Sequence, residues 1–352
     1  MAKDIKRVTY PIDRLKDEIK VCFQARLPVM LHGHPGCGKS AAVKQIAEES
    51  GRPLVDFRLS MRNPVDVLGV PGEEGGRMVW FPPKSLPLKG DKKLENAILF
   101  LDEINACPRA LQVAAYQLVF DRRTGDAELA DGVDIIAAGN LIDDLAVTYE
   151  MSSALRNRFV HYEVEVSLSA WKKWALKNGI KEEVIAYLSY QPKYLYFFDK
   201  KVHVYQFPTP RSWEFVSRLL SVDPSAKEAE RFVPCLGESV AIQFAGFMRV
   251  YNKIPNAEAV VSGDMSVKCP TKPDELFAFG GALVGAATSC ENVLQGMRNM
   301  VRYATEQMPA EFATYAVKDL LKTPAFNDHW DELVKSEEWA AFGKKYQAAT
   351  MV

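Results

Sequence analysis

The 352-residue chain lacks several features that would set it apart from ordinary globular proteins. No apolar run approaches the ~18 residues that a membrane helix needs, and no apolar signal segment follows the charged N-terminal residues. Its six cysteines form no Cys-x-x-Cys pair and have no histidine at ligand spacing, so neither a zinc site nor a disulfide framework is indicated. The net charge of -1 gives no general attraction to nucleic acid or anionic lipid. We therefore expect a cytoplasmic protein with no membrane contact, and nucleic acid is not favoured as a partner.

The composition is that of a chain that folds throughout. Hydrophobic residues make up 48% and charged residues 25%, far from the polar composition of disordered segments. At roughly 100 to 200 residues per domain, the length predicts two or three packed units.

Short apolar runs alternate with helical patterns between Val29 and Val166, as in a parallel sheet covered on both faces. The predicted strands are residues 28–32, 54–59, 97–101, 133–138 and 161–166. Helical patterns then replace the strands, and a proline-rich stretch at 252–273 resembles a linker. We predict an α/β core with a five-stranded parallel sheet at 1–166, a helical lid at 167–252 and an extra helical C-terminal region at 253–352.

One segment carries a phosphate-binding motif. The pattern G-x-x-x-x-G-K-[ST] is matched at every fixed position by Gly33-His34-Pro35-Gly36-Cys37-Gly38-Lys39-Ser40, hereafter the phosphate loop. A predicted strand precedes it and a predicted helix follows it, which is the context that the motif requires. Backbone N–H groups of such a loop surround the β-phosphate at the positive end of the helix. Lys39 then reaches the β- and γ-phosphates, and the Ser40 hydroxyl ligates Mg²⁺.

A second candidate segment follows the wholly apolar strand at 97–101. Asp102 and Glu103 come directly after this strand. Asp102 is placed to hold Mg²⁺ directly or through water, and Glu103 to polarise an attacking water. The acidic pair therefore points to nucleotide hydrolysis, which a phosphate loop alone does not specify.

Polar and cationic side chains suited to a γ-phosphate follow further along the chain. Asn140 closes the fourth predicted strand with an amide that can reach this phosphate or the attacking water. Arg156 and Arg158 precede the fifth strand, and one of them can enter the phosphate site of a neighbouring subunit, where negative charge develops. Arg211 opens a predicted lid helix and can contact the γ-phosphate of its own subunit.

Together these motifs resemble the AAA+ ATPases, and more narrowly the MoxR family in the helix-2-insert branch. The phosphate loop corresponds to Walker A and Asp102-Glu103 to Walker B. The extension typical of this branch, Asp-Glu-Ile-Asn-x-x-Pro, is matched by residues 102–108, and residues 72–80 resemble the inserted hairpin. The resemblance places sensor 1 on Asn140.

The same resemblance implies two catalytic arginines, for which the sequence offers three candidates. Sensor 2 falls on Arg211, and the arginine finger falls on Arg158, with Arg156 as the second choice. It implies a Mg²⁺-dependent ATPase that assembles into a ring of identical subunits, expected to be a hexamer. The implied output is chaperone-like remodelling or activation of a client protein or metalloenzyme, often with a partner that carries a von Willebrand factor type A domain.

Two other classes of function remain open from the sequence. A nucleic-acid motor or restriction-type NTPase would show hydrolysis stimulated by DNA or RNA and binding that weakens steeply as salt rises. A nucleotide-gated assembly scaffold would keep its biological activity when Glu103→Gln blocks turnover. The client, the ring size, the choice of ATP over GTP and the role of residues 253–352 are not specified by any motif.

Overall fold

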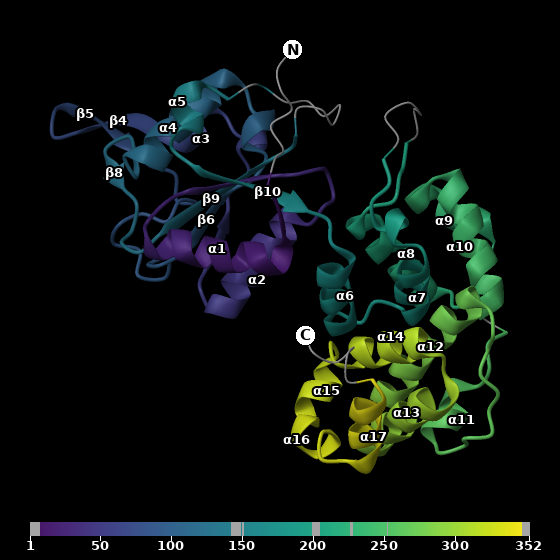
Figure 1. Cartoon of the computed structure of the whole chain (residues 1–352). Helices are drawn as coiled ribbons and strands as arrows, with labels where there is room; N and C mark the ends of the chain where they lie inside the picture. Colours follow the sequence, from purple (N-terminus) through teal and green to yellow (C-terminus); the bar gives the residue numbers. More distant parts are fainter. Residues whose placement is uncertain are drawn as a thin grey trace. The chain divides into compact units, whose positions relative to one another are not determined.

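The computed structural model describes residues 8–141, 149, 151–198, 205–225, 228–251 and 253–346. The chain forms two compact units, of which the first ends at Ser167 and the second begins at Leu168. The first unit is a sheet covered by helices, and the second is built from helices (Figure 1). Among the described residues, no helix is both long and apolar enough to span a bilayer.

The sheet of the first unit has six parallel strands in the order β1-β10-β2-β9-β6-β3. In chain order they are β1 (Thr9–Pro11), β2 (Val29–His32), β3 (Leu54–Asp56), β6 (Ile98–Leu101), β9 (Asp134–Gly139) and β10 (Val160–Glu165). All five predicted strands are present, so the prediction of a parallel α/β sheet is confirmed. The predicted number is one too small, because β1 pairs with β10 at the edge and its three residues are too few to show a strand pattern.

Helices cover both faces of this sheet because successive strand residues point to opposite sides. Ile98 and Phe100 of β6 join the core beneath α1 (Ile12–Gln24) and α2 (Lys39–Ser50). Leu99 and Leu101 join the core beneath α4 (Arg109–Phe120) on the other face (Figure 1). The continuous apolar run at 97–101 thus supplies both cores.

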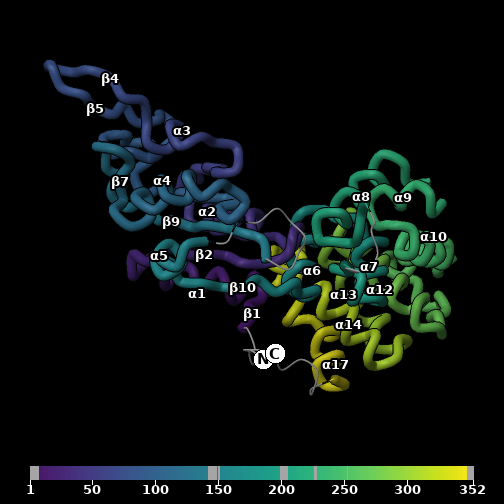
Figure 2. The backbone as a smooth tube through the Cα atoms, turned by 90° about the horizontal axis from the view of Figure 1, so that it is seen from above, coloured from purple at the N-terminus to yellow at the C-terminus, as the bar shows by residue number. Residues whose placement is uncertain are grey.

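Two hairpins extend from the first unit. Strands β4 (Val70–Glu74) and β5 (Arg77–Phe81) pair in antiparallel fashion and project away from the sheet (Figure 2). They follow η1 (Leu59–Met61) and α3 (Pro64–Leu68) and contain the predicted hairpin at 72–80. The second hairpin joins β7 (Arg123–Thr124) to β8 (Ala127–Glu128).

The remaining elements of the first unit are short. They are η2 (Ile104–Ala106) and α5 (Ser153–Arg156). The Ser152 side chain caps α5 by accepting a hydrogen bond from the backbone N–H of Leu155. A single helical turn is unstable by itself, so α5 depends on its surroundings for its position.

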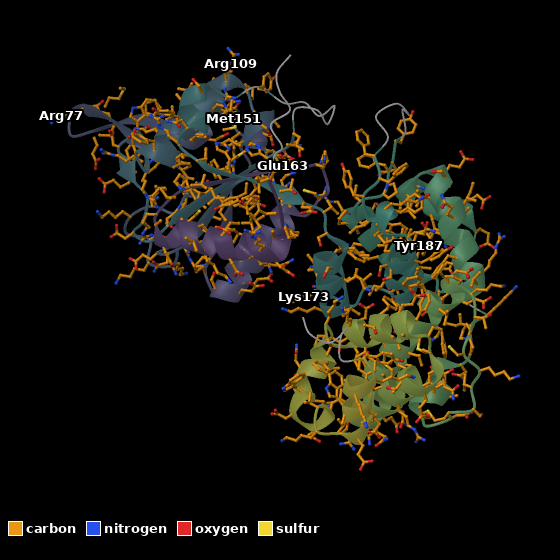
Figure 3. All side chains as sticks on the ribbon, viewed as in Figure 1. Arg77, Arg109, Met151, Glu163, Lys173 and Tyr187 are labelled. Carbon is orange, nitrogen blue, oxygen red and sulfur yellow. The ribbon has the colours of Figure 1, made fainter. Side chains whose placement is uncertain are left out.

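The second unit consists of short and medium helices. They are α6 (Leu168–Lys177), α7 (Glu182–Tyr190), η4 (Pro192–Leu195), α8 (Pro210–Val222), α9 (Ala229–Leu236), α10 (Glu238–Tyr251), α11 (Ala257–Val261), α12 (Pro273–Ser289), α13 (Val293–Gln307), α14 (Ala310–Leu320), α15 (Pro324–Asp328), α16 (Trp330–Leu333) and α17 (Glu337–Lys345). Tyr187 on α7 lies in an aromatic core with Trp213 and Phe244 (Figure 3).

The expected linker at 252–273 contains a packed helix, so that interpretation was wrong. Ala257, Val260 and Val261 of α11 are buried in the core formed with α12 and α13. The proline-rich flanks hid this helix, because five residues carry too little periodicity to indicate one. Since α12 also packs against α7, the helices before and after residue 252 share one compact unit. A functional division into lid and C-terminal region stays a prediction.

Candidate nucleotide-binding site

The phosphate loop connects the end of β2 to the start of α2. Gly36 and Gly38 have φ angles of 76° and 101°, in the left-handed region that favours glycine. A Cβ atom at Gly33 would lie 2.9 Å from Cys37 Sγ, so the turn also needs glycine there for space. No acidic residue lies in the first turn of α2, and its positive end is therefore suited to an anion such as phosphate.

Lys39 is the buried cation of the loop. Lys39 is 8% exposed, and its Nζ donates to the carbonyl oxygens of Gly33 and His34 at 2.6 and 3.0 Å. It also donates to Asn140 Oδ1 at 3.1 Å. The structure thus brings together two predicted site residues that are 101 positions apart in the sequence.

Ser40 and Asp102 meet beside this lysine. The Ser40 hydroxyl donates to Asp102 Oδ2 at 2.9 Å, and the backbone N–H of Glu103 donates to Asp102 Oδ1 at 2.9 Å. Burial raises the pKa of Asp102, and the negative charges of Glu103 and Asp56 act in the same direction, while the two hydrogen bonds oppose them. A divalent cation would offset the burial and the repulsion, and hydroxyl and carboxylate oxygens are ligands that Mg²⁺ prefers. The donor set therefore fits Mg²⁺.

Glu103 has a strained backbone and a hydrogen-bonded side chain. Its φ of 56° is unusual for a residue that is not glycine, and such conformations cluster at functional sites. The Ser60 hydroxyl, just beyond β3, donates to Glu103 Oε2 at 2.6 Å. Ser60 therefore orients the carboxylate that was predicted to act on water.

Asn105 holds the backbone of Asn140 in place. Asn105 is 5% exposed; its Nδ2 donates to the Asn140 carbonyl at 2.7 Å, and its Oδ1 accepts from the Asn140 N–H at 3.1 Å. Gly139 makes room for this clamp, since a Cβ there would lie 2.5 Å from Asn105 Oδ1 and 2.8 Å from Met30 Cε. The sensor-1 candidate is thus fixed from one side by Asn105 and contacted from the other by Lys39.

The two candidate finger arginines differ in their surroundings. The Arg158 guanidinium lies over the rings of Tyr116 and Phe120 on α4, 4.0 and 4.3 Å from their centroids. Its Nη1 also donates to the Ala154 carbonyl at 2.7 Å. Arg158 is therefore engaged within its own subunit by cation–π contacts and a hydrogen bond.

Arg156 is exposed and lines a cavity of about 620 Å³ between α4 and α5. The cavity is also lined by Arg109 and Met151, which lie on the same side of the first unit in Figure 3. Arg156 is thus more exposed than Arg158, which is half-buried.

Arg211 belongs to the second unit. It is exposed near the start of α8, whose first turn is fixed by reciprocal hydrogen bonds between Thr209 and Ser212. The capping box confirms the predicted start of a helix at this point, and a sensor-2 role for Arg211 stays a prediction.

Asn105 and Ser60 were not among the predicted site residues. Asn105 lies in the segment at 102–108 that marks the family resemblance, although the motif alone gave it no role. Ser60 could be found only from the strand order, because β3 lies beside β6 in the sheet and its end therefore approaches Glu103. Neither contact follows from spacing along the chain.

Comparisons with known proteins agree with this geometry. The family described as "ATPase family associated with various cellular activities (AAA)" matches residues 29–163, which include the phosphate loop, Asp102, Glu103 and Asn140. Protein NorQ of Paracoccus denitrificans is 33% identical over 162 residues, which cover 42% of this chain and 57% of NorQ.

Two other relatives match similar lengths of this chain. BssE of Thauera aromatica, whose name describes a candidate chaperone, is 30% identical over 139 residues, covering 37% of this chain and 48% of BssE. Midasin of Giardia intestinalis is 31% identical over 161 residues, covering 43% of this chain and 3% of midasin. The matches thus span about half of NorQ and BssE and a small part of midasin.

Residues 29–163 form an AAA domain, and this domain is that of an ATPase. The fold and the motifs agree, because the matched stretch runs from β2 to β10 and contains each of the clustered polar residues described above. The similarity to NorQ and BssE fits the resemblance of this domain to MoxR-type AAA+ ATPases.

Proposed function

We propose that the chain hydrolyses ATP in a ring of identical subunits and uses the energy to remodel or activate a client protein. The observation that supports this most directly is the meeting of Lys39, Ser40, Asp102 and Asn140 at the carboxyl edge of the sheet. In α/β sheets this edge is where nucleotides bind.

The proposed mechanism assigns one task to each group. Lys39 and the loop N–H groups hold the β- and γ-phosphates, while Ser40 and Asp102 would hold Mg²⁺, and the bound ion would supply positive charge that offsets the charge of the phosphates. Glu103 accepts a proton from the attacking water, and Asn140 orients that water or the γ-phosphate. Arg211 contacts the γ-phosphate when the lid closes.

For the arginine that acts across the subunit boundary, we propose Arg156. Its exposure on the cavity wall supports this role, whereas the ring contacts of Arg158 support an anchoring role for that side chain. A guanidinium supplied by a neighbour typically accelerates turnover by about 10³- to 10⁵-fold. Arg158 then fixes α5 against α4 so that Arg156 is presented outward.

The output that we propose is chaperone-like. The name of BssE and the resemblance to the MoxR family support it. A hexameric ring and a partner with a von Willebrand factor type A domain complete the proposal, and both rest on the resemblance. The proposed cytoplasmic location rests on the sequence analysis instead.

The test begins with nucleotide binding and turnover in the purified chain. Lys39→Ala should abolish ATP binding measured by calorimetry, because the cation that contacts the phosphates is lost. Arg156→Ala should keep ATP binding and lose turnover by about 10³-fold or more. Tight ATP binding by Lys39→Ala, or full turnover by a chain that stays monomeric with ATP and Mg²⁺, would refute the proposal.

A matched variant distinguishes the two arginines. Arg158→Lys keeps the charge but loses the planar stacking on Tyr116 and Phe120, so it should lower the stability of the first unit more than Arg156→Lys. If Arg158→Ala abolishes turnover at unchanged stability and Arg156→Ala does not, the finger is Arg158.

A further inference from the structure

Two histidines connect the phosphate loop to the segment that carries Arg156. His32 is the last residue of β2 and directly precedes Gly33, while His161 lies on the adjacent strand β10. His32 Nε2 and His161 Nδ1 are 2.8 Å apart, and their rings stack with centroids 5.1 Å apart. His161 Nε2 in turn lies 2.7 Å from the carbonyl oxygen of Arg156.

The carbonyl at one end gives this chain of hydrogen bonds a direction. The Arg156 oxygen can only accept, so His161 Nε2 must carry the proton. A neutral His161 then has a bare Nδ1, which requires a proton on His32 Nε2. In this neutral form His32 donates to His161 and His161 donates to the Arg156 carbonyl, so the His161 ring is held in its orientation by hydrogen bonds at both nitrogens.

The position of α5 depends on such contacts. This helix is one turn long, and the Arg156 carbonyl at its end accepts the His161 bond together with the N–H of Phe159 at 3.2 Å. Arg158 attaches the following residues to α4 on the other side. The backbone that bears the Arg156 side chain is thus held between the sheet and α4.

We propose that His161, oriented by His32, is a positioning residue that aims Arg156 at the phosphate site of the neighbouring subunit. This inference rests on the proposed function, in which Arg156 acts across the subunit boundary. Strand β2, which leads into the phosphate loop of a subunit, thereby also helps to fix the position of Arg156 in that subunit. This Arg156 acts in the phosphate site of the next subunit. His161 touches no substrate, and its effect is exerted on the neighbour's turnover.

Mixed assemblies of two full-length variants test this directly. An acceptor chain carries Arg156→Ala and keeps its own phosphate loop, and a donor chain carries Lys39→Ala and keeps Arg156. Each alone should be inactive, and the mixture should hydrolyse ATP only at acceptor sites that face a donor. His161→Phe, which keeps an aromatic ring but removes both hydrogen bonds, is then added to either chain.

The expected result is asymmetric. His161→Phe in the donor should lower turnover of the mixture by about 10- to 100-fold, the scale of a small misplacement of a catalytic group. The same substitution in the acceptor should leave turnover unchanged. Equal losses in both arrangements, a loss only in the acceptor, or no loss in either would overturn the proposal.

Two controls separate this inference from the function on which it rests. If the mixture without any histidine change stays inactive, the assignment of Arg156 as a trans-acting group has failed, and the inference fails with it. Tyr162→Phe, the next residue on β10, removes a hydroxyl that lies 3.4 Å from Cys22 Sγ. In the donor it should leave turnover unchanged, and a loss as large as that of His161→Phe would show a general disturbance of β10.

Discussion

Both units bury charged side chains, and they use them in different ways. In the first unit, Lys39 and Asp102 are each 8% exposed and lie at the edge where the parallel strands end. In the second, Lys172 on α6 and Asp319 on α14 form a buried ion pair, and Lys172 Nζ also donates to the Ser189 hydroxyl at 2.8 Å. Lys172 and Asp319 neutralise each other inside a bundle of helices.

This difference shows that burial of charge alone does not identify a functional site. Among the described residues, Lys39 has carbonyl and amide partners and no carboxylate partner, so its positive charge can act on a bound anion. The charge of Lys172 is compensated by Asp319, although burial still lowers the pKa of Lys172 to about 8. Uncompensated charge at a strand end indicates chemistry, whereas compensated charge between helices indicates structure.

Among the variants that test this comparison of the two units, the largest expected effect comes from neutralising one carboxylate in the first unit. Glu103→Gln should lower ATP turnover by about 10²- to 10⁴-fold, because the group that accepts the proton of water is lost. Since Glu103 is exposed, thermal unfolding and ATP binding should stay the same. Steady-state hydrolysis, calorimetry and a melting curve measure the three quantities. Turnover close to that of the original chain would remove Glu103 from the mechanism.

Neutralising a carboxylate in the second unit should have the opposite outcome. Asp319→Ala leaves Lys172 buried without its partner and should lower the free energy of unfolding by about 3–5 kcal/mol. Denaturant titration measures this loss, and ATP affinity of the first unit should not change. The double variant Lys172→Met with Asp319→Leu is the control and should lose less than the single variant. If Asp319→Ala is as stable as the original chain, the proposed difference between the buried charges of the two units is wrong.

The pH dependence of stability sharpens the comparison further. Burial raises the pKa of Glu182 on α7 from 4.5 to about 7, and the nearby charge of Glu183 adds to the rise. The folded state therefore holds this proton more tightly than the unfolded state does. The contribution of Glu182 to stability is fully present below pH 4.5 and is lost as the pH rises to about 7.

Glu182→Gln tests this expectation. Its free energy of unfolding relative to the original chain should rise between pH 5 and 7, by an amount on the order of 2 kcal/mol. Urea unfolding at a series of pH values measures the difference. A constant difference across this range would show that Glu182 is charged in the folded protein.

The smallest predicted effect concerns the clamp on Asn140. Asn105→Ala removes both hydrogen bonds to the Asn140 backbone and should lower kcat about tenfold, which corresponds to ~1.4 kcal/mol. Asn105→Asp is the matched variant, because it can still accept from the Asn140 N–H but cannot donate to the carbonyl. The kcat of Asn105→Asp should lie between that of the original chain and that of Asn105→Ala. Equal kcat values for these three chains would exclude a role for the clamp in turnover.

Much of the first unit could be predicted because its signals are local. The phosphate loop is contiguous, and apolar runs mark the strands that directly precede Asp102 and Asn140. The contacts that pair Ser60 with Glu103 and Arg158 with Tyr116 are set by strand order and helix placement instead. A linear motif gives the residues that do chemistry but not the residues that hold them.

The second unit was less predictable for a related reason. The helical patterns at 170–177, 182–190 and 211–220 are long enough to show periodicity, and α6, α7 and α8 contain them. The five residues of α11 are too few to show periodicity, and the prolines around them resemble a linker. What makes this segment a helix is its burial against α12 and α13, which no local pattern encodes.

Gly139 limits how the protein can be altered. Even a methyl group at this position would collide with the Asn105 side chain and with Met30, although Gly139 itself has no proposed task in the reaction. A larger residue there would require the Asn105 side chain, and with it the clamp on Asn140, to move, while the flexible end of Met30 would also have to shift. Single substitutions of Gly139 would therefore impair the protein as if this residue were catalytic. Glycine is required there only because it has no side chain.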